Sequence, residues 1–267
     1  MKALNRNISV KLALLFFLFP IVFSLGCYAP PVTNNLSAME LFAYGKKLVD
    51  KGDYKDAVDV YKKIKFNFPD SIKVSRARLF AANGYYADEK YEEAIAEYKE
   101  FTKYHPAHLE VPFAYYRIGM SNFYQILPSQ LDQTKTKEAL ENFNIIRERY
   151  PESIYYDIAG ERISFCKRRL AEHSYGIGRF YYKMRMYRPA IKRLKRFIRD
   201  CEIPDLKIRA MGILAESLWK DEENERALML YKEIALIYKN TAYGKRALQM
   251  LKRYGADYEI EVPSSLQ

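Results

Sequence analysis

An alanine recurs five times in the same local pattern, and this repeat constrains the fold more than any other feature of the 267-residue chain. Each alanine is followed four residues later by Tyr, Phe or Leu, and seven residues later by Ile or Phe. Residues at these offsets lie on one face of an α-helix. The pattern therefore predicts five amphipathic helices that contain Ala57, Ala94, Ala139, Ala190 and Ala227.

In four of the five segments a small residue stands twelve positions before the alanine. These residues are Gly45, Ala82, Gly178 and Ala215. They predict a preceding helix that packs closely on the helix with the alanine. We expect these small residues to lie opposite the small residue of the next helix. Pro69, Pro106 and Pro151 follow the first three alanines and end their helices. This order of residues resembles the tetratricopeptide repeat. The resemblance implies an all-α fold, a right-handed superhelix of five tetratricopeptide-like helix pairs, which is an α-solenoid.

The repeats are unevenly spaced, with 37, 45, 51 and 37 residues between successive alanines. A tetratricopeptide repeat usually has about 34 residues. In the third repeat the small residue, Gly119, comes eight residues too early, so the surplus is a loop at residues 126–133. The longest interval predicts one long helix from about Ile154 to Arg185.

The first 26 residues read as a secretion signal, with basic residues followed by a short apolar run. A membrane span needs about 20 apolar residues, and this run is shorter. It ends in Gly26-Cys27 and resembles the bacterial lipoprotein signal, in which the cysteine becomes the acylated N-terminus. We expect Cys27 to carry a covalent lipid, and no other cofactor. An ordinary signal or a single-span anchor is the alternative.

These features divide the chain into a lipoprotein signal peptide (1–26), a lipidated flexible tether (27–36), a five-repeat domain (37–253) and a C-terminal tail (254–267). The repeat domain has a possible subdivision, into client-binding repeats (37–125) and partner-docking repeats (134–253).

Three stretches carry a narrower resemblance. Besides the lipoprotein signal they are YYRIGMSNFYQILPSQLDQTKTKEALENFNIIRERYPESIYY (115–156) and LAEHSYGIGRFYYKMRMYRPAIKRL (170–194). Together they resemble the BamD (ComL) family, lipoproteins of the outer-membrane β-barrel assembly machine. The resemblance covers the whole chain.

The family resemblance implies a non-enzymatic scaffold at the outer membrane, lipid-anchored on its periplasmic face. Such a scaffold docks on the periplasmic domains of the barrel-inserting subunit, BamA, and helps receive unfolded outer-membrane proteins. Other assembly-machine lipoproteins are expected partners, and nucleic acid is not. The alternative function is a periplasmic repeat lipoprotein that binds or coordinates peptidoglycan-metabolising enzymes.

The first helix of each repeat is expected to line a groove for client segments. The groove side falls on fixed offsets from the small residue, which select Phe42, Lys46, Leu79, Asn83, Tyr86, Tyr116, Met120 and Phe123. Arg117 joins this set through the hypothesis that follows. An aromatic floor with few polar groups suits an extended or helical peptide. The alternative is that these aromatic side chains pack against neighbouring repeats.

A finer hypothesis concerns the end of the client. Asn83 and Arg117 stand where carboxylate-binding tetratricopeptide proteins keep an asparagine and an arginine, and Lys46 adds charge nearby. The lysines of that clamp are absent, because Phe42 and Phe113 replace them. The remaining residues predict half of a clamp for a client C-terminus.

A second surface is basic. The formal net charge is +11, and the segment from 183 to 199 holds basic residues and no acid, among them Arg185, Arg188, Lys192, Arg193, Arg196 and Arg199. Like charges three or four residues apart on a helix repel. An acidic partner surface would offset this repulsion, so we expect a partner dock here. Anionic lipid headgroups are the competing partner.

The remaining candidate residues carry weak signals. Cys166 and Cys201 either stay free or form a disulfide, and a rotation of about 120° between Cys166 and Gly178 disfavours the bond. His105 occupies the repeat position of Phe68 and Tyr150, so it reads as structural. No metal site is expected. The sequence has no phosphate loop, nucleophile elbow or HExxH motif, and no enzymatic activity is expected.

Overall fold

A computed structural model describes residues 35–255, so the signal peptide, Cys27 and residues 256–267 lie outside the described residues. Eleven helices occur in the described range: α2 (Ala38–Lys51), α3 (Tyr54–Asn67), α4 (Val74–Ala87), α5 (Tyr91–Tyr104), α6 (Val111–Tyr124), α7 (Thr134–Arg149), α8 (Tyr156–Lys183), α9 (Tyr187–Asp200), α10 (Pro204–Lys220), α11 (Asn224–Ile237) and α12 (Ala242–Arg253).

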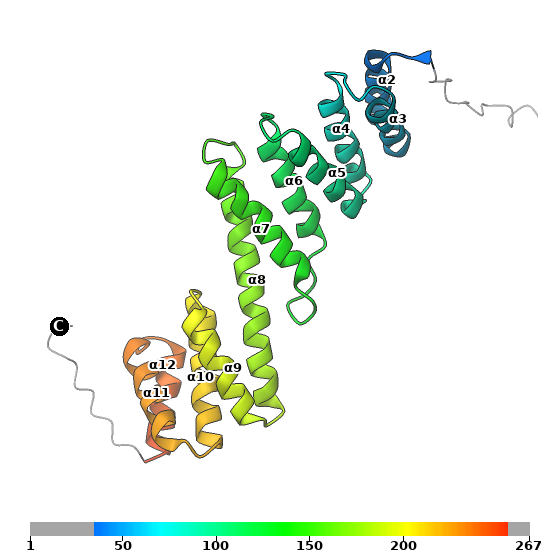
Figure 1. Cartoon of the computed structure of the whole chain (residues 1–267). Helices are drawn as coiled ribbons and strands as arrows, with labels where there is room; N and C mark the ends of the chain where they lie inside the picture. Colours follow the sequence, from blue (N-terminus) through cyan, green and yellow to red (C-terminus); the bar gives the residue numbers. More distant parts are fainter. Residues whose placement is uncertain (1–34, 256–267) are drawn as a thin grey trace, which may run out of the picture.

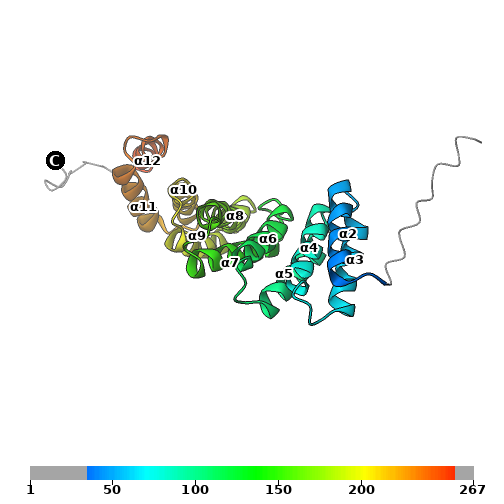
Figure 2. The ribbon, with the colours of Figure 1, turned by 90° about the horizontal axis from the view of Figure 1, so that it is seen from above.

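Each helix packs on the helices that precede and follow it, so the chain forms a row of helical hairpins (Figure 1). The five pairs are α2–α3, α4–α5, α6–α7, α8–α9 and α10–α11, and α12 packs on α11 at the end of the row. Seen from above, the row runs from α2 to α12 as a curved array (Figure 2). The predicted all-α solenoid of five tetratricopeptide-like pairs is confirmed.

Prolines end the second helix of the first three repeats, as the sequence predicts. Helices α3, α5 and α7 each stop two residues before Pro69, Pro106 or Pro151. The residue between helix and proline has a φ angle of −136°, −130° or −133°. A proline disfavours helical geometry in the residue before it, so the three helices end in the same way.

Close helix packing depends on small residues, but not in the expected pairing of small with small. A Cβ atom on Gly119 would lie 2.5 Å from Cε1 of Phe143, and one on Gly178 would lie 2.6 Å from Cδ2 of Leu194. Gly45 faces the ring of Tyr61 in the same way. The glycines thus accommodate the bulky residue four positions after the repeat alanine, because that side chain points directly at the partner backbone.

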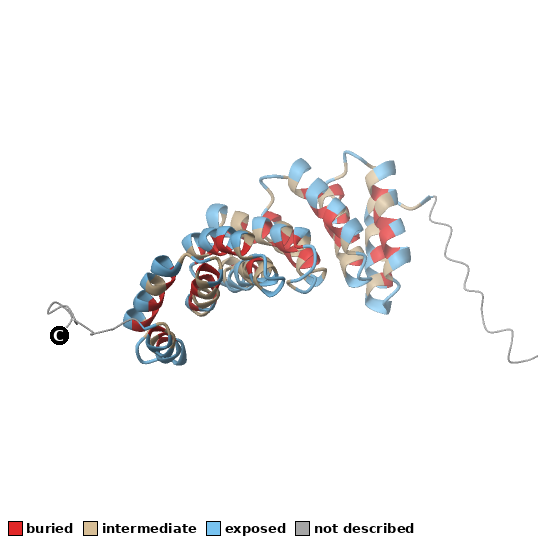
Figure 3. Ribbon diagram, turned by 90° about the horizontal axis from the view of Figure 1, so that it is seen from below, coloured by how far each residue is buried: buried red, intermediate tan, exposed pale blue. Residues whose placement is uncertain are grey.

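Helix α8 has 28 residues and joins two parts of the solenoid (Figure 1). Its first half, with Ala159 and Cys166, lies in the core around Phe143 of α7. Its second half packs on α9 through Gly178 and Leu194. The predicted long helix is confirmed to within two residues at each end. Buried residues lie where helices face one another, and exposed residues lie on their outer sides (Figure 3).

The surplus loop of the third repeat lies between α6 and α7. Buried Gln133 donates hydrogen bonds from Nε2 to the carbonyl oxygens of Pro128 and Leu131, at 2.9 and 3.1 Å, and its Oε1 accepts one from Thr136. A ring nitrogen of His173, in the middle of α8, lies 2.7 Å from the carbonyl oxygen of Ser129. The loop is therefore held by its own side chains and tied to the long helix.

Candidate functional site

The predicted partner dock forms one exposed face of α9. Ala190, Ile191, Leu194 and Phe197 are buried on the opposite face. The predicted basic residues are all exposed, and we call this set the basic face: Arg185, Arg188, Lys192, Arg193, Arg196 and Arg199. Arg185, just before the helix, has a φ angle of 58°.

Little negative charge compensates the basic face within the described part of the chain. Arg188 Nε lies 3.4 Å from Asp221 Oδ2, and Arg199 pairs with its neighbour Asp200 at 2.8 Å. Lys192, Arg193 and Arg196 form no hydrogen bond or ion pair with any residue in 35–255. The face can therefore receive several carboxylates at once.

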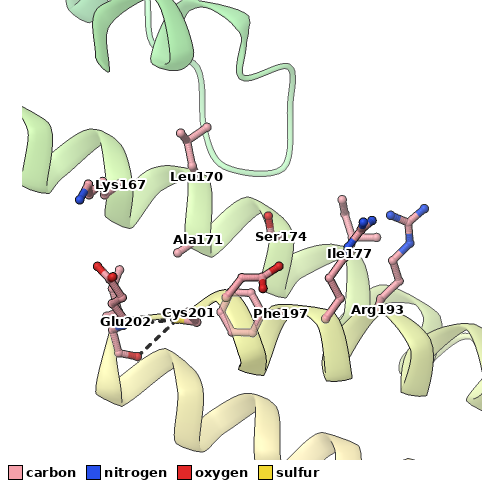
Figure 4. A pocket seen from close by; sticks show the side chains of 12 residues that line it. Lys167, Leu170, Ala171, Ser174, Ile177, Arg193, Phe197, Cys201 and Glu202 are labelled. Carbon is pink, nitrogen blue, oxygen red and sulfur yellow. Dashed lines mark hydrogen bonds between the residues drawn. The ribbon is translucent and has the colours of Figure 1, made fainter. Parts of the chain in front are cut away.

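An apolar cleft of about 580 Å³ lies beside the basic face (Figure 4). Leu170, Ala171 and Ile177 of α8 line one side, and Phe197 of α9 lines the other. The charged side chains that line it are Lys167, Arg193, Arg196, Asp200 and Glu202, three basic and two acidic. The repeat pattern does not predict this cleft, because its lining comes from α8, α9 and the connection from α9 to α10. Apolar contact next to cationic side chains is a combination typical of protein interfaces.

The predicted client groove is only partly open. Leu79 and Met120 are buried, at 6% and 5% exposure, in the cores of the second and third repeats. Their prediction as client-contacting residues is therefore wrong, because their helix face is turned far enough toward the next helix to be covered. Lys46 is exposed, and the other six predicted residues are half-buried: Phe42, Asn83, Tyr86, Tyr116, Arg117 and Phe123.

Aromatic contacts occupy much of this side. Phe42 lies 5.1 Å from Phe80, ring centroid to ring centroid, and Tyr116 stacks on Tyr155 at 4.9 Å. Phe123 lies 4.9 Å from Phe165 of α8. The alternative, that these aromatic side chains pack against other rings of the solenoid, therefore holds for the buried part of Phe42, Tyr116 and Phe123.

The residues of the proposed half-clamp fall into two groups. Asn83 Oδ1 accepts a 2.6 Å hydrogen bond from the hydroxyl of Tyr98, and the positive charge of Arg117 acts on the same Tyr98. The Arg117 guanidinium lies over the rings of Tyr86 and Phe113, at 4.3 and 5.1 Å. Burial raises the pKa of Tyr86 to about 12 although Arg117 opposes the rise. Lys46, on α2, has no contact with this group in the described structure.

The two cysteines of the repeat domain are free thiols, so the candidate disulfide between Cys166 and Cys201 does not form. Cys166 lies in the core around Phe143, and Cys201 lies in the core of α9 and α10. Two separate cores keep their side chains apart. Burial raises the pKa of the Cys166 thiol to about 11.

Residues 35–255 contain no group of three or more His, Cys, Asp or Glu that could hold a metal ion. His105 packs against Phe101, with the ring centroids 5.6 Å apart, and burial lowers its pKa. Within the same range, no helix has the length and apolar character to cross a membrane.

Comparison with known proteins shows which family this chain belongs to. A family model described as "YfiO: Outer membrane lipoprotein" matches residues 34–216, which include the groove and the basic face. The chain belongs to this family. Among curated relatives, "Outer membrane protein assembly factor BamD" of Rickettsia prowazekii (strain Madrid E) is 26% identical over 231 residues, 86% of this chain and 92% of the relative. The protein of the same name from Caulobacter vibrioides is 28% identical over 187 residues, 70% of this chain and 61% of the relative.

Two solved structures match most of this chain at low identity and low TM-score. A tetratricopeptide repeat protein from Parabacteroides merdae is 17% identical over 83% of this chain and 80% of its own, with a TM-score of 0.36. The crystal structure of MamA protein covers 85% of this chain and 98% of its own at 19% identity, with a TM-score of 0.33.

Proposed function

We propose that this protein is a lipid-anchored scaffold of outer-membrane protein assembly. In this role Cys27 holds it to the periplasmic face of the outer membrane, and the basic face docks on the periplasmic domains of a BamA-like subunit. The first three repeats help receive unfolded outer-membrane proteins. The function is binding and positioning, without catalysis.

The observation that carries the proposal is the junction of the basic face with the apolar cleft between α8 and α9. Arg193 and Arg196 belong to both, and neither forms a hydrogen bond or ion pair with a residue in 35–255, although the charge of Arg196 acts on nearby Asp200. A partner segment with acidic and apolar side chains would fill the cleft and offset the like-charge repulsion along α9. Membership in an outer-membrane lipoprotein family, with relatives named as assembly factors, supports this partner over lipid headgroups.

Client reception rests on the groove side of α2, α4 and α6. Half-buried rings leave their outer edges free, and the side-chain amide nitrogen of Asn83 is not used by the bond to Tyr98. Together with Arg117 these groups suit an aromatic residue followed by a carboxylate. The proposed client is therefore the C-terminal segment of an unfolded outer-membrane protein.

The test is binding of the chain without residues 1–27 to purified periplasmic domains of the BamA homologue from the same organism. Each lost hydrogen bond to a charged group costs about 1.5–3 kcal/mol. Arg193→Glu with Arg196→Glu is therefore expected to weaken binding by about 100-fold or more. The wild-type affinity should also fall as salt rises, because the contacts are ionic.

A matched control is Lys99→Glu with Lys103→Glu on α5, where both lysines are exposed and outside the basic face. It should bind as the wild type does. Equal binding by wild type and the α9 variant would disprove the dock and leave family membership intact. No binding by either protein would disprove docking on this partner.

A further inference from the structure

A second cleft, of about 400 Å³, lies among α8, α10 and α12. It is on the groove side of the C-terminal repeats, away from the outer surface of α9. Its lining includes Tyr175, Arg179, Arg209, Glu216, Tyr231 and Arg246. An adjoining cavity of about 750 Å³ shares Tyr175, Arg179 and Arg209 and extends to Ser129 in the loop before α7.

Three arginines from three different helices converge on this cleft. Arg179 forms no hydrogen bond or ion pair with any described residue. Arg209 is 4.0 Å from Asp205, and Arg246 Nη2 is 2.8 Å from Glu216 Oε1. Glu172 and Asp205 line only the adjoining cavity. The cleft thus carries an excess of positive charge.

A buried donor in the cleft lacks an acceptor. The Tyr231 residue is 3% exposed, and its hydroxyl has no hydrogen-bond partner among the described residues. Tyr98, at the same position of the second repeat, donates to Asn83. Glu216 holds the place of Asn83 in the fifth repeat, but its carboxylate binds Arg246 and the hydroxyl of Tyr182 instead. A second carboxylate on Arg246 would release Glu216 to accept from Tyr231.

The chain leaves the last helix beside this cleft. The Tyr254 ring stacks on Trp219 with centroids 3.5 Å apart, and Trp219 lies one helical turn after Glu216. Gly255 has a φ angle of 68°, the left-handed geometry in which chains commonly turn at the end of a helix. The residues that follow read ADYEIEV, with Asp257, Glu259 and Glu261 at alternate positions.

We propose that residues 257–261 bind in the cleft among α8, α10 and α12, with their carboxylates on Arg246, Arg209 and Arg179. Alternate residues of an extended segment point to the same side. Three carboxylates would then face the arginines. Tyr258 and Ile260 would point to the other side.

The distances permit this contact. Gly255 and Arg246 are nine residues apart on or next to α12, which is about 14 Å along a helix. An extended segment from Gly255 to Glu261 spans up to about 20 Å. The covalent connection also raises the effective concentration of the segment to the millimolar range. An acidic peptide from another protein must therefore displace the tail before it binds the cleft.

Amide hydrogen exchange of the full chain tests the proposal. At low salt the amides of residues 257–261 should exchange at least about tenfold more slowly than in a free peptide of this sequence. Arg179→Glu with Arg209→Glu should abolish the protection. Adding Asp257→Lys, Glu259→Lys and Glu261→Lys to that variant should restore it, because both sets of charges are then reversed.

The experiment has two controls. Protection of the α10 amides in the same data shows whether the variants are folded. Lys192→Glu with Arg193→Glu reverses two charges on α9 and should leave the tail protected. Free-peptide exchange in the wild type would overturn the proposal, as would protection that survives Arg179→Glu with Arg209→Glu. Protection that grows with protein concentration would assign the tail to a second copy and overturn it too. The result does not depend on binding through the basic face.

Discussion

The two ends of the solenoid differ on the side formed by the first helix of each repeat. In the first three repeats, groove-side residues pack on one another, as in the stack of Tyr116 on Tyr155 and the contact of Arg117 with Tyr86. In the last two repeats, Arg179 and Arg209 on the first helices line a cleft. The repeat backbone sets where side chains point, and the side chains decide whether the surface is covered or open.

The difference has a chemical consequence. Aromatic side chains stabilise one another through ring contacts, whereas guanidinium groups on one surface repel one another unless anions bind between them. The N-terminal repeats can therefore be stable with an empty groove. We expect the C-terminal repeats to gain stability when a carboxylate binds the arginines. We expect six substitutions, in four tests, to separate these two behaviours.

The largest expected effect is loss of an N-terminal core ring. Phe143 is fully buried and joins the core residues of α6, α7 and α8. Phe143→Ala removes these contacts and leaves a cavity, at a cost of about 3–5 kcal/mol in the free energy of unfolding. Urea unfolding followed by circular dichroism measures the loss. Leu194→Ala, at the same position of the fourth repeat, should cost about 2–5 kcal/mol. Effects below 1 kcal/mol at Phe143 would contradict the described packing.

Gly119 and Gly176 should respond to substitution in opposite directions. A Cβ on Gly119 meets the buried ring of Phe143, whereas one on Gly176 of α8 has nothing within 4 Å. Gly119→Ala is expected to destabilise by about 1–3 kcal/mol through overpacking. Gly176→Ala should stabilise by roughly 0.5–1 kcal/mol, because alanine favours the helix. Thermal unfolding of the two variants compares them directly, and a stabilising Gly119→Ala would contradict the close approach of α6 and α7.

The contrast also shows which features a sequence can reveal. The repeat alanines, the three prolines and the 51-residue interval predict the helix pairs and the long α8, because these signals act within one helix or between neighbours. The groove offsets select residues of α2, α4 and α6. They do not reveal that Tyr155 and Phe165, from the start of α8, cover part of the groove, because that contact joins different repeats.

The remaining errors have the same origin. Leu79 and Met120 are buried because the next helix is turned toward them, which the offset rule does not contain. Cys166 and Cys201 belong to different cores, which agrees with the rotation along α8 that disfavours a bond between them. Both clefts depend on how far neighbouring helices diverge, and no local pattern encodes that divergence. The basic charge on α9, by contrast, is readable directly from the residue types.

A smaller effect is expected at Arg117. If the N-terminal groove binds a client carboxylate, a peptide that ends in Phe with a free carboxylate should bind about tenfold more tightly than its amide, since a hydrogen bond to a charged group contributes about 1.5–3 kcal/mol. Arg117→Ala should remove this preference while both peptides keep their aromatic contribution. Fluorescence anisotropy with labelled peptides measures the four affinities. Equal affinities for acid and amide in the wild type would contradict the half-clamp.

The smallest effect is expected at an ion pair in the N-terminal repeats. Lys135 Nζ lies 2.5 Å from Glu92 Oε1 and 3.2 Å from Glu138 Oε2, and its hydrogen bond to Glu92 lowers the pKa of that carboxyl. A lowered folded-state pKa means that the contribution is present above the usual pKa of Glu92 and is lost as pH falls through its folded value. Because Glu92 is largely exposed, Lys135→Ala should cost only about 0.2–1 kcal/mol at pH 7, and less at pH 3. Urea unfolding at both pH values measures the difference. A loss at pH 7 as large as that of Phe143→Ala would mean that ion pairs hold these repeats together, whereas a loss several times smaller assigns that role to the buried rings.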